Sequence, residues 1–402
     1  MKTRKSIFKV WTSILVLFAL LAGCASAPSK NADTKAAKSK IDSLAAWKGE
    51  WQSFNAVSSA TALNEAYKTT AEKLPNYTAD GFKAAVANMY STPIVRLKFD
   101  GSNTVLLTVA DADGNEKDIP CEYRYKGDVP IPGFDGYFWH TFEAVKAVRG
   151  LAHAQYLIAF PPHRDTPEGL LHWHARFGAK DIPSLVNGDP MWWPTYTDAS
   201  MTKEDLTKEF EKSIPAVAAM FPAEPFAPYK GKWINTALIY EDPRPAVQKV
   251  YEELIKEFAG KKDGMDFTKQ DIIALAKKAY GTAADFTHLE FTAEDDKNEL
   301  TVWKGSTELL RLAYKQDGAN KLKPTLKAFT AADRAKAGKF AFISMTQPGG
   351  KPLHMHLWYG ARPSEIDNVD GKPTCIPAAS SEEEVALRVR NTCRRFLQAA
   401  VK

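Results

Sequence analysis

The feature that most constrains the fold of this chain is a repeat that spans most of its length. Three motifs of the first half return in the second half in the same order: Lys48-Gly49-Glu50-Trp51 as Lys230-Gly231-Lys232-Trp233, His172-Trp173-His174 as His354-Met355-His356, and Pro194-Thr195-Tyr196 as Pro373-Thr374-Cys375. The offset is 182 residues for the first two motifs and 179 for the third. Because 402 residues are long for one domain and suit two, we expect one structural unit used twice.

Composition indicates where the two units begin and end. Residues 25–43 are rich in Ala, Ser and Lys and contain no aromatic residue, which is typical of a flexible tether. Pro222, Pro225 and Pro228 fall within seven residues and disfavour helix, so they indicate a short, stiff linker. The expected segments are a leader at 1–23, a tether at 24–43, a first domain at 44–222 and a second domain at 226–402.

The first residues predict export. A basic start is followed by a mainly apolar stretch at residues 10–22, which is shorter than the roughly 20 residues of a spanning helix. Leu21-Ala22-Gly23-Cys24 resembles the bacterial lipobox, so Cys24 is the expected lipidation site. An ordinary signal peptide or an uncleaved anchor is the alternative. We expect an extracytoplasmic, lipid-anchored protein at a periplasmic membrane face or the cell surface.

Net charge excludes nucleic acid as an expected partner. Removal of the leader takes away Lys2, Arg4, Lys5 and Lys9 and no acidic residue, which leaves 49 basic residues against 48 acidic ones. A nearly neutral mature chain lacks the basic excess that nucleic-acid binding requires.

Three cysteines remain after Cys24, and their spacing contains no zinc-ribbon pattern. Cys393 lies on a stripe of helical spacing, which favours burial as a small apolar residue. A disulfide between Cys375 and Cys393 is an alternative that spacing alone does not decide.

The order of expected elements is the same in both units. Helical spacing of apolar residues comes early, at residues 82–90 and 247–258. Short β-branched and aromatic runs follow in the first unit at residues 95–99, 104–109 and 156–160. Thr202 and Ser381 are typical N-cap residues and predict the start of a closing helix in each unit. The pattern predicts a mainly β, α+β fold, in which a curled antiparallel sheet or small barrel carries helices at its ends.

Three histidines lie within twelve residues in the first unit. His172 and His174 are two apart in a strand-like segment, so both point to one face. His163 ends the preceding strand, and the turn-forming residues between them predict a hairpin that brings it back beside the pair. Three imidazoles with a fourth position open are a recognised zinc arrangement, although copper or nickel also accepts imidazole. A solvated His-x-His pair with a loop histidine is the alternative.

The segment around these histidines resembles a known family. The run from Tyr156 through His163 to Gly178, followed by Trp193-Pro194-Thr195-Tyr196 and an acidic closing helix, is similar to the signature end of the ZinT (YodA) family. The resemblance covers roughly residues 44–222 and, more weakly, 226–402. It implies two tandem lipocalin-like (calycin) β-barrel domains flanked by short helices, with zinc bound by His163, His172 and His174.

The second unit departs from the family pattern. It keeps His354 and His356, but the expected position of the third histidine, around Met345 to Gln347, holds none. His288, on an earlier strand-like segment, is the candidate substitute, and an unrelated surface histidine is the alternative reading. We expect this domain to bind metal weakly or to serve only as structure.

These observations favour a zinc-binding lipoprotein over two other classes. The expected function is capture, buffering or delivery of zinc, with an importer or its solute-binding protein as the partner. One alternative is a zinc-dependent hydrolase with Asp165 or Glu168 as general base, but we interpret both as turn residues and expect no enzyme. The other is a lipocalin-like carrier of a small apolar ligand, to which the tryptophans would be suited, although core packing explains them equally well.

Overall fold

The computed structural model describes residues 41–111, 114–148, 150–262, 264–279, 285–319, 326–367 and 373–401. The expected leader, most of the tether and Cys24 lie outside these ranges. Within them, no helix combines the length and apolarity that a membrane crossing requires.

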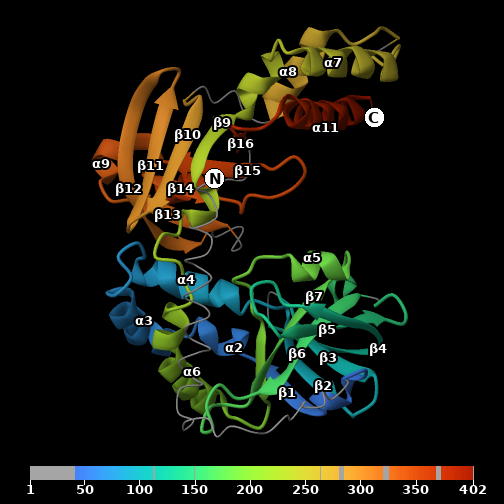
Figure 1. Cartoon of the computed structure of the whole chain (residues 1–402), viewed down its shortest axis with the longest axis vertical. Coiled ribbons are helices and arrows are strands. Elements are labelled where there is room, and N and C mark those ends of the chain that lie inside the picture. Colours follow the sequence, from blue (N-terminus) through green and yellow to red (C-terminus); the bar gives the residue numbers. More distant parts are fainter. Residues whose placement is uncertain are drawn as a thin grey trace, which may run out of the picture. The chain divides into compact units, whose positions relative to one another are not determined.

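The first half of the chain forms a closed barrel of eight strands, each antiparallel to both neighbours (Figure 1). The strands follow chain order: β1 (Gly49–Ser53), β2 (Ile94–Phe99), β3 (Thr104–Ala110), β4 (Glu116–Pro130), β5 (Phe138–Ala144), β6 (Tyr156–His163), β7 (His172–Gly178) and β8 (Thr195–Asp198). The barrel closes where β8 pairs with β1, through Ser53 opposite Tyr196.

The second half repeats this topology. Its strands are β9 (Gly231–Asn235), β10 (His288–Glu294), β11 (Lys297–Lys304), β12 (Thr307–Ala319), β13 (Lys327–Ala331), β14 (Phe342–Met345), β15 (Met355–Gly360) and β16 (Thr374–Pro377). Strand β9 closes the barrel between β16 and β10. Two closed barrels with helices confirm the fold class that the sequence predicts.

Helices accompany each barrel. The α-helices of the first half are α2 (Asn55–Ser58), α3 (Asn64–Ala71), α4 (Ala79–Met89), α5 (Ile182–Val186) and α6 (Lys203–Ala218). Those of the second half are α7 (Pro245–Glu257), α8 (Lys269–Ala279), α9 (Arg334–Ala337), α10 (Pro363–Ile366) and α11 (Glu382–Ala400). The 3₁₀ helices are η1 (Leu44–Trp47), η2 (Thr61–Leu63), η3 (Ala152–Ala154), η4 (Ala227–Tyr229), η5 (Thr236–Glu241) and η6 (Gly338–Phe340).

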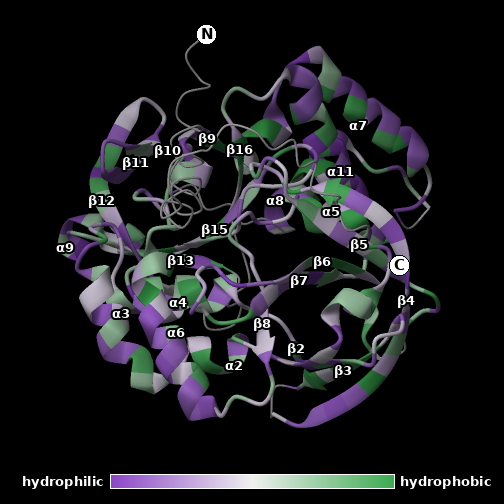
Figure 2. Cartoon of the chain, turned by 60° about the horizontal axis from the view of Figure 1, so that its bottom comes forward, coloured by the Kyte–Doolittle hydropathy of each residue, from purple (hydrophilic) through white to green (hydrophobic). Residues whose placement is uncertain are grey.

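The closing helices begin where the sequence predicts. The Thr202 side chain caps α6, and Ser381 forms a full capping box with Glu384 at the start of α11. Along α6 and α7, hydrophobic and hydrophilic residues alternate, as expected of helices that bury one face (Figure 2).

The contacts within the structure divide the chain into two compact units. Of the described residues, one unit comprises those up to Thr70 together with Lys83–Pro222, and the other comprises Ala71–Phe82 together with those from Ala223 onward. The short segment Ala71–Phe82 therefore belongs with the second barrel, where the backbone N–H of Thr78 donates to the carbonyl of Gln316 at 3.0 Å. Such a long-range contact has no sequence signal.

The second unit buries residues at its very start. Phe226 and Tyr229 are fully buried in the core of that barrel. The cysteines also lie in cores: Cys121, Cys375 and Cys393 are buried free thiols. Cys375 lies in the barrel core and Cys393 in the cluster that the helices form, so the structure holds no disulfide between them.

Side chains from all eight strands fill the interior of the first barrel. The ring of Trp47 packs edge to face against those of His140 and Trp173, at centroid distances of 5.9 and 6.1 Å. The ring of Trp51 packs in the same way against Trp173 at 6.0 Å. This is a favourable aromatic geometry. Tyr196 stacks on Trp173 at 5.1 Å. This aromatic core occupies the space that a lipocalin-type carrier uses for its ligand.

Candidate metal centre

The three histidines of the first unit come from one hairpin. Strand β6 ends at His163 and β7 begins at His172, and these two residues lie opposite each other in the ladder. The register shifts between Phe160 and His163, because the two prolines between them have no N–H to donate. This bulge turns His163 toward the pair on β7, as the sequence predicts.

The histidines lie on the outer face of the barrel wall. Trp173 and Ala175, which alternate with them along β7, belong to the barrel core. Since successive side chains of a strand point to opposite faces, His172 and His174 point away from that core. The centre is therefore separate from the barrel interior.

The three rings converge closely enough to share one ion. Their centroids are 4.3 Å apart for His163 and His172, 5.1 Å for His172 and His174, and 5.3 Å for His163 and His174. One ring nitrogen from each lies within 4.8 Å of the other two. Among the described residues, this is the only cluster of three His, Cys, Asp or Glu side chains with converging ligand atoms.

Hydrogen bonds fix the tautomer of two of the rings. Nδ1 of His163 lies 3.0 Å from the carbonyl oxygen of Pro161, and Nδ1 of His172 lies 3.0 Å from that of Leu170. A carbonyl only accepts, so each Nδ1 carries the proton and donates it. The lone pair of each neutral ring is therefore on Nε2, where a metal is bound.

The third ring is oriented by Thr195. Its Oγ1 lies 2.9 Å from Nδ1 of His174 and donates its own proton to the carbonyl of Trp193 at 2.8 Å. Oγ1 must then accept from Nδ1–H, which leaves the lone pair of His174 on Nε2. The Trp-Pro-Thr-Tyr motif thus contributes a support for a ligand, a role that sequence reasoning did not assign.

Arg176 anchors the chain that leads to Thr195. Its guanidinium donates to the carbonyl oxygens of Leu185 and Trp192 at 2.8 Å each and lies 5.4 Å from the centroid of the Trp193 ring. Only 3% of the residue is exposed, and burial lowers the pKa of Arg176 to about 10. It remains charged at neutral pH and holds the loop between β7 and β8. Sequence reasoning missed it, although an Arg two residues after His174 on the same strand face is a usable signal.

Electrostatics keep two of the imidazoles neutral. Burial lowers the pKa of His163, and the neighbouring His172 lowers it further. Burial also holds the pKa of His174 well below its ordinary value, with added effects of His172, His163 and Arg176. Neutral imidazole is the form that binds metal, so these two rings can bind a metal ion without first releasing a proton.

The second barrel repeats the histidine pair. The rings of His354 and His356 lie 5.3 Å apart at 80°, against 5.1 Å at 74° for His172 and His174. Nδ1 of His354 lies 3.0 Å from the carbonyl of Pro352, and Nδ1 of His356 lies 2.8 Å from Oγ1 of Thr374. The supports of the pair are therefore conserved between the two barrels of this chain.

The third position of the second barrel is occupied by Gly349. This residue bridges to His354 as His163 does to His172. This position follows the expected location around Met345 to Gln347, because the connection is shorter. Four residues lie between Gly349 and His354, whereas eight lie between His163 and His172. Met345 itself is buried in the barrel core.

His288 does not complete a site with His354 and His356. It lies on β10, which is separated from β15 by β16 and β9. Its ring stacks on Trp303 at 5.5 Å, and its Nδ1 contacts Oγ1 of Thr287 at 3.0 Å. Two strands therefore lie between His288 and the pair on β15.

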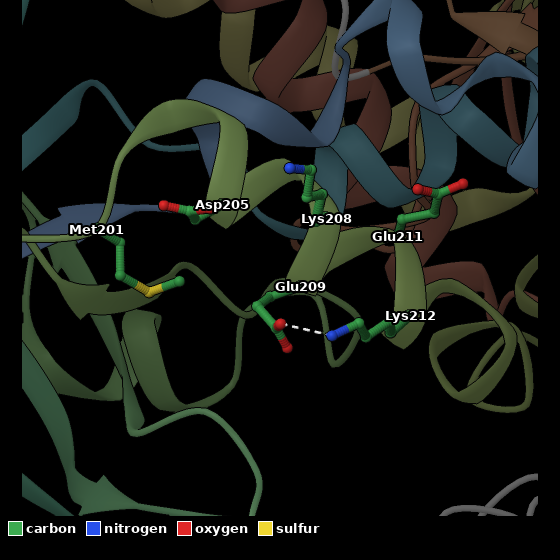
Figure 3. Close-up of a pocket in the computed structure, with 6 residues that line it drawn as sticks. All are labelled: Met201, Asp205, Lys208, Glu209, Glu211 and Lys212. Carbon is green, nitrogen blue, oxygen red and sulfur yellow. Dashed lines mark hydrogen bonds and ion pairs between the residues drawn. The ribbon is translucent and has the colours of Figure 1, made fainter.

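A hollow along α6 offers no comparable chemistry. It is lined by Met201, Asp205, Lys208, Glu209, Glu211 and Lys212 (Figure 3). Lys212 pairs with Glu209 at 2.6 Å, as the dashed line in Figure 3 marks, and Lys208 pairs with Glu204 at 2.7 Å. Neutralised surface charges of this kind are typical of a solvated helix face.

A closed antiparallel barrel whose outer wall gathers three converging imidazoles defines a lipocalin-like metal-binding domain. Residues 30–212 match the family model described as ZinT (YodA) periplasmic lipocalin-like zinc-recruitment. Residues 30–212 therefore form a domain of the ZinT type, whose family model describes periplasmic zinc recruitment.

Two solved structures are similar to the chain. The Zn(II)-bound ZinT-like domain of Streptococcus pneumoniae AdcA is 20% identical, with 43% of this chain and 91% of that chain covered and a TM-score of 0.33. Zn(II)-bound AdcA from Streptococcus pneumoniae is 21% identical, with 46% and 41% covered and a TM-score of 0.34. No curated protein matches the chain significantly.

Proposed function

We propose that this chain captures zinc outside the cytoplasm through His163, His172 and His174. The convergence of three Nε2 lone pairs, each fixed by a hydrogen bond at Nδ1, is the observation that carries the proposal. Three imidazoles at about 2.0–2.1 Å are a common zinc ligand set. The family match of the same segment supports zinc over copper and nickel.

The proposed role is capture and release at a membrane surface. The side chains of His163 and His172 are 22% and 11% exposed, so an ion can enter and leave without unfolding of the barrel. Lipidation at Cys24, supported by the lipobox sequence, holds the protein beside the membrane. An importer or its solute-binding protein is the proposed recipient of the zinc.

The second barrel is proposed to bind metal more weakly. His354 and His356 supply two imidazoles, and the third position is a glycine with no side chain to offer. Burial lowers the pKa of His354, and so does the positive charge of Arg388, which disfavours a cation there. We therefore expect one tight zinc site per chain.

A zinc-dependent hydrolase is the competing function. It requires an open coordination position for water and a general base. Turnover of an ester or phosphate substrate that disappears when the histidines are replaced would favour the hydrolase.

A carrier of apolar ligands is disfavoured because aromatic side chains fill the first barrel.

Zinc content of the soluble chain, residues 25–402, tests the proposal. Unaltered protein should retain about one zinc per chain after exposure to a moderate chelator. The variant with His172→Ala and His174→Ala should retain none, whereas the matched variant with His354→Ala and His356→Ala should retain it. Retention of zinc by the first variant would contradict the proposal.

A further inference from the structure

The turn between β6 and β7 places a carboxylate over the three-histidine centre. Oδ1 of Asp165 lies 3.8 Å from Nε2 of His163, and Oδ2 lies 3.8 Å from Nε2 of His172. The two oxygens of one carboxylate thus face the two nitrogens that carry lone pairs. Glu168, the other acid of this turn, is exposed.

This arrangement favours a cation at its centre. Because both Nδ1 atoms donate to carbonyl oxygens, both Nε2 atoms are acceptors, and an ionised carboxylate also only accepts. Acceptors that face one another repel unless a positive charge lies between them. Nε2 of His174 is a third acceptor that converges on the same point.

The distances suit a fourth ligand. With bonds of about 2.0–2.2 Å to nitrogen and oxygen, the ligand atoms of a tetrahedral zinc site lie about 3.4 Å apart. The carboxylate needs to move only a few tenths of an ångström to reach this distance from His163 and His172. It must move further toward His174, since Asp165 lies outside the group of ligand atoms that converge within 4.8 Å. Asp165 has room for that shift, because its side chain is 49% exposed.

We propose that Asp165 is the fourth zinc ligand and that it closes the coordination sphere of the centre. This inference rests on the proposed zinc binding by His163, His172 and His174. Three nitrogens and one oxygen fill a tetrahedral site, so no position remains for a reactive water. A filled tetrahedral set also disfavours copper(II), which prefers tetragonal geometry. The centre is then built for holding zinc rather than for hydrolysis.

Cobalt(II) and azide are the probes for this closure. In the unaltered soluble chain, the visible spectrum of bound cobalt should be tetrahedral and should not change when azide is added. In Asp165→Ala, the open position should admit azide and shift the spectrum. Glu168→Ala, in the same turn, is the matched control and should behave as the unaltered chain.

Zinc affinity provides the second measurement. Asp165→Ala should weaken zinc binding by roughly tenfold or more, and Asp165→Glu should recover part of the loss. If cobalt in the unaltered chain binds azide, or if Asp165→Ala retains full affinity and the unaltered spectrum, Asp165 is not a ligand while the three-histidine proposal stands. If the unaltered chain binds no zinc at all, both proposals fail.

Discussion

Thr195 orients His174, one of the three proposed ligands, and its removal should weaken zinc binding without removal of any ligand. In Thr195→Val the γ-carbon replaces Oγ1, so Nδ1–H of His174 loses its acceptor and the carbonyl of Trp193 loses its donor. Valine suits the strand and nearly keeps the volume. The barrel should therefore fold, while the His174 ring loses the bond that fixes its tautomer.

The expected loss of affinity follows from the role of such supports. Replacement of an outer partner of a metal-binding histidine typically costs 10- to 100-fold in affinity, or about 1.4–2.7 kcal/mol at 1.36 kcal/mol per tenfold. The assay is competition with a chromophoric zinc chelator at pH 7.5. Thr374→Val removes the equivalent bond to His356 in the second barrel and should leave the tight site unchanged.

Equal zinc affinity of Thr195→Val and the unaltered chain would refute this reasoning, because the Nδ1 bond would then not govern the ligand. If Thr374→Val lost as much zinc affinity as Thr195→Val, the result would contradict the assignment of the tight site to the first barrel.

Three further predictions concern the second site, pH and the loop after β7. Gly349→His should give a second zinc per chain in metal titrations, because a Cβ there meets only the Gln347 carbonyl at 4.0 Å; an unchanged stoichiometry would contradict the assignment of the third position. His163 and His174 have pKa values below the ordinary 6.5, so the unfolded chain takes up protons first as the pH falls. The melting temperature of the metal-free protein should therefore fall between pH 7 and pH 5. The fall should be smaller in the variant with His163→Ala and His174→Ala; an equal fall in the two proteins would exclude a contribution of these histidines. Arg176→Met should lower the free energy of unfolding by roughly 2–3 kcal/mol in denaturant titrations, since buried carbonyls lose charged donors; a neutral effect would contradict its anchoring role.

The first centre was predictable because its residues are local in the sequence. Alternation in a strand places His172 and His174 on one face, and the short turn with its proline-rich bulge returns His163 to them. The β and helical patterns likewise gave the element types, since the amphipathic stripes of α4 and α7 follow the observed buried faces.

The remaining features depend on register and on contacts between distant segments. The offset of 182 residues that aligns the two histidine pairs does not hold for the strand before them. Tyr156 lies opposite Gly178 in the first barrel, and Phe342 lies opposite Gly360 in the second, so Tyr156 and Phe342 occupy equivalent positions. A repeat read from the sequence therefore missed Gly349. Thr195 and Arg176 hold the His174 ring and the loop after β7 through tertiary hydrogen bonds. Such bonds cannot be predicted from composition.

The most direct test of zinc binding by the three histidines is a crystal structure of the zinc-loaded soluble chain with anomalous data at the zinc edge. The predicted result is one strong peak at about 2.0–2.1 Å from Nε2 of His163, His172 and His174. A fully occupied peak elsewhere, with these three rings unoccupied, would contradict the assignment.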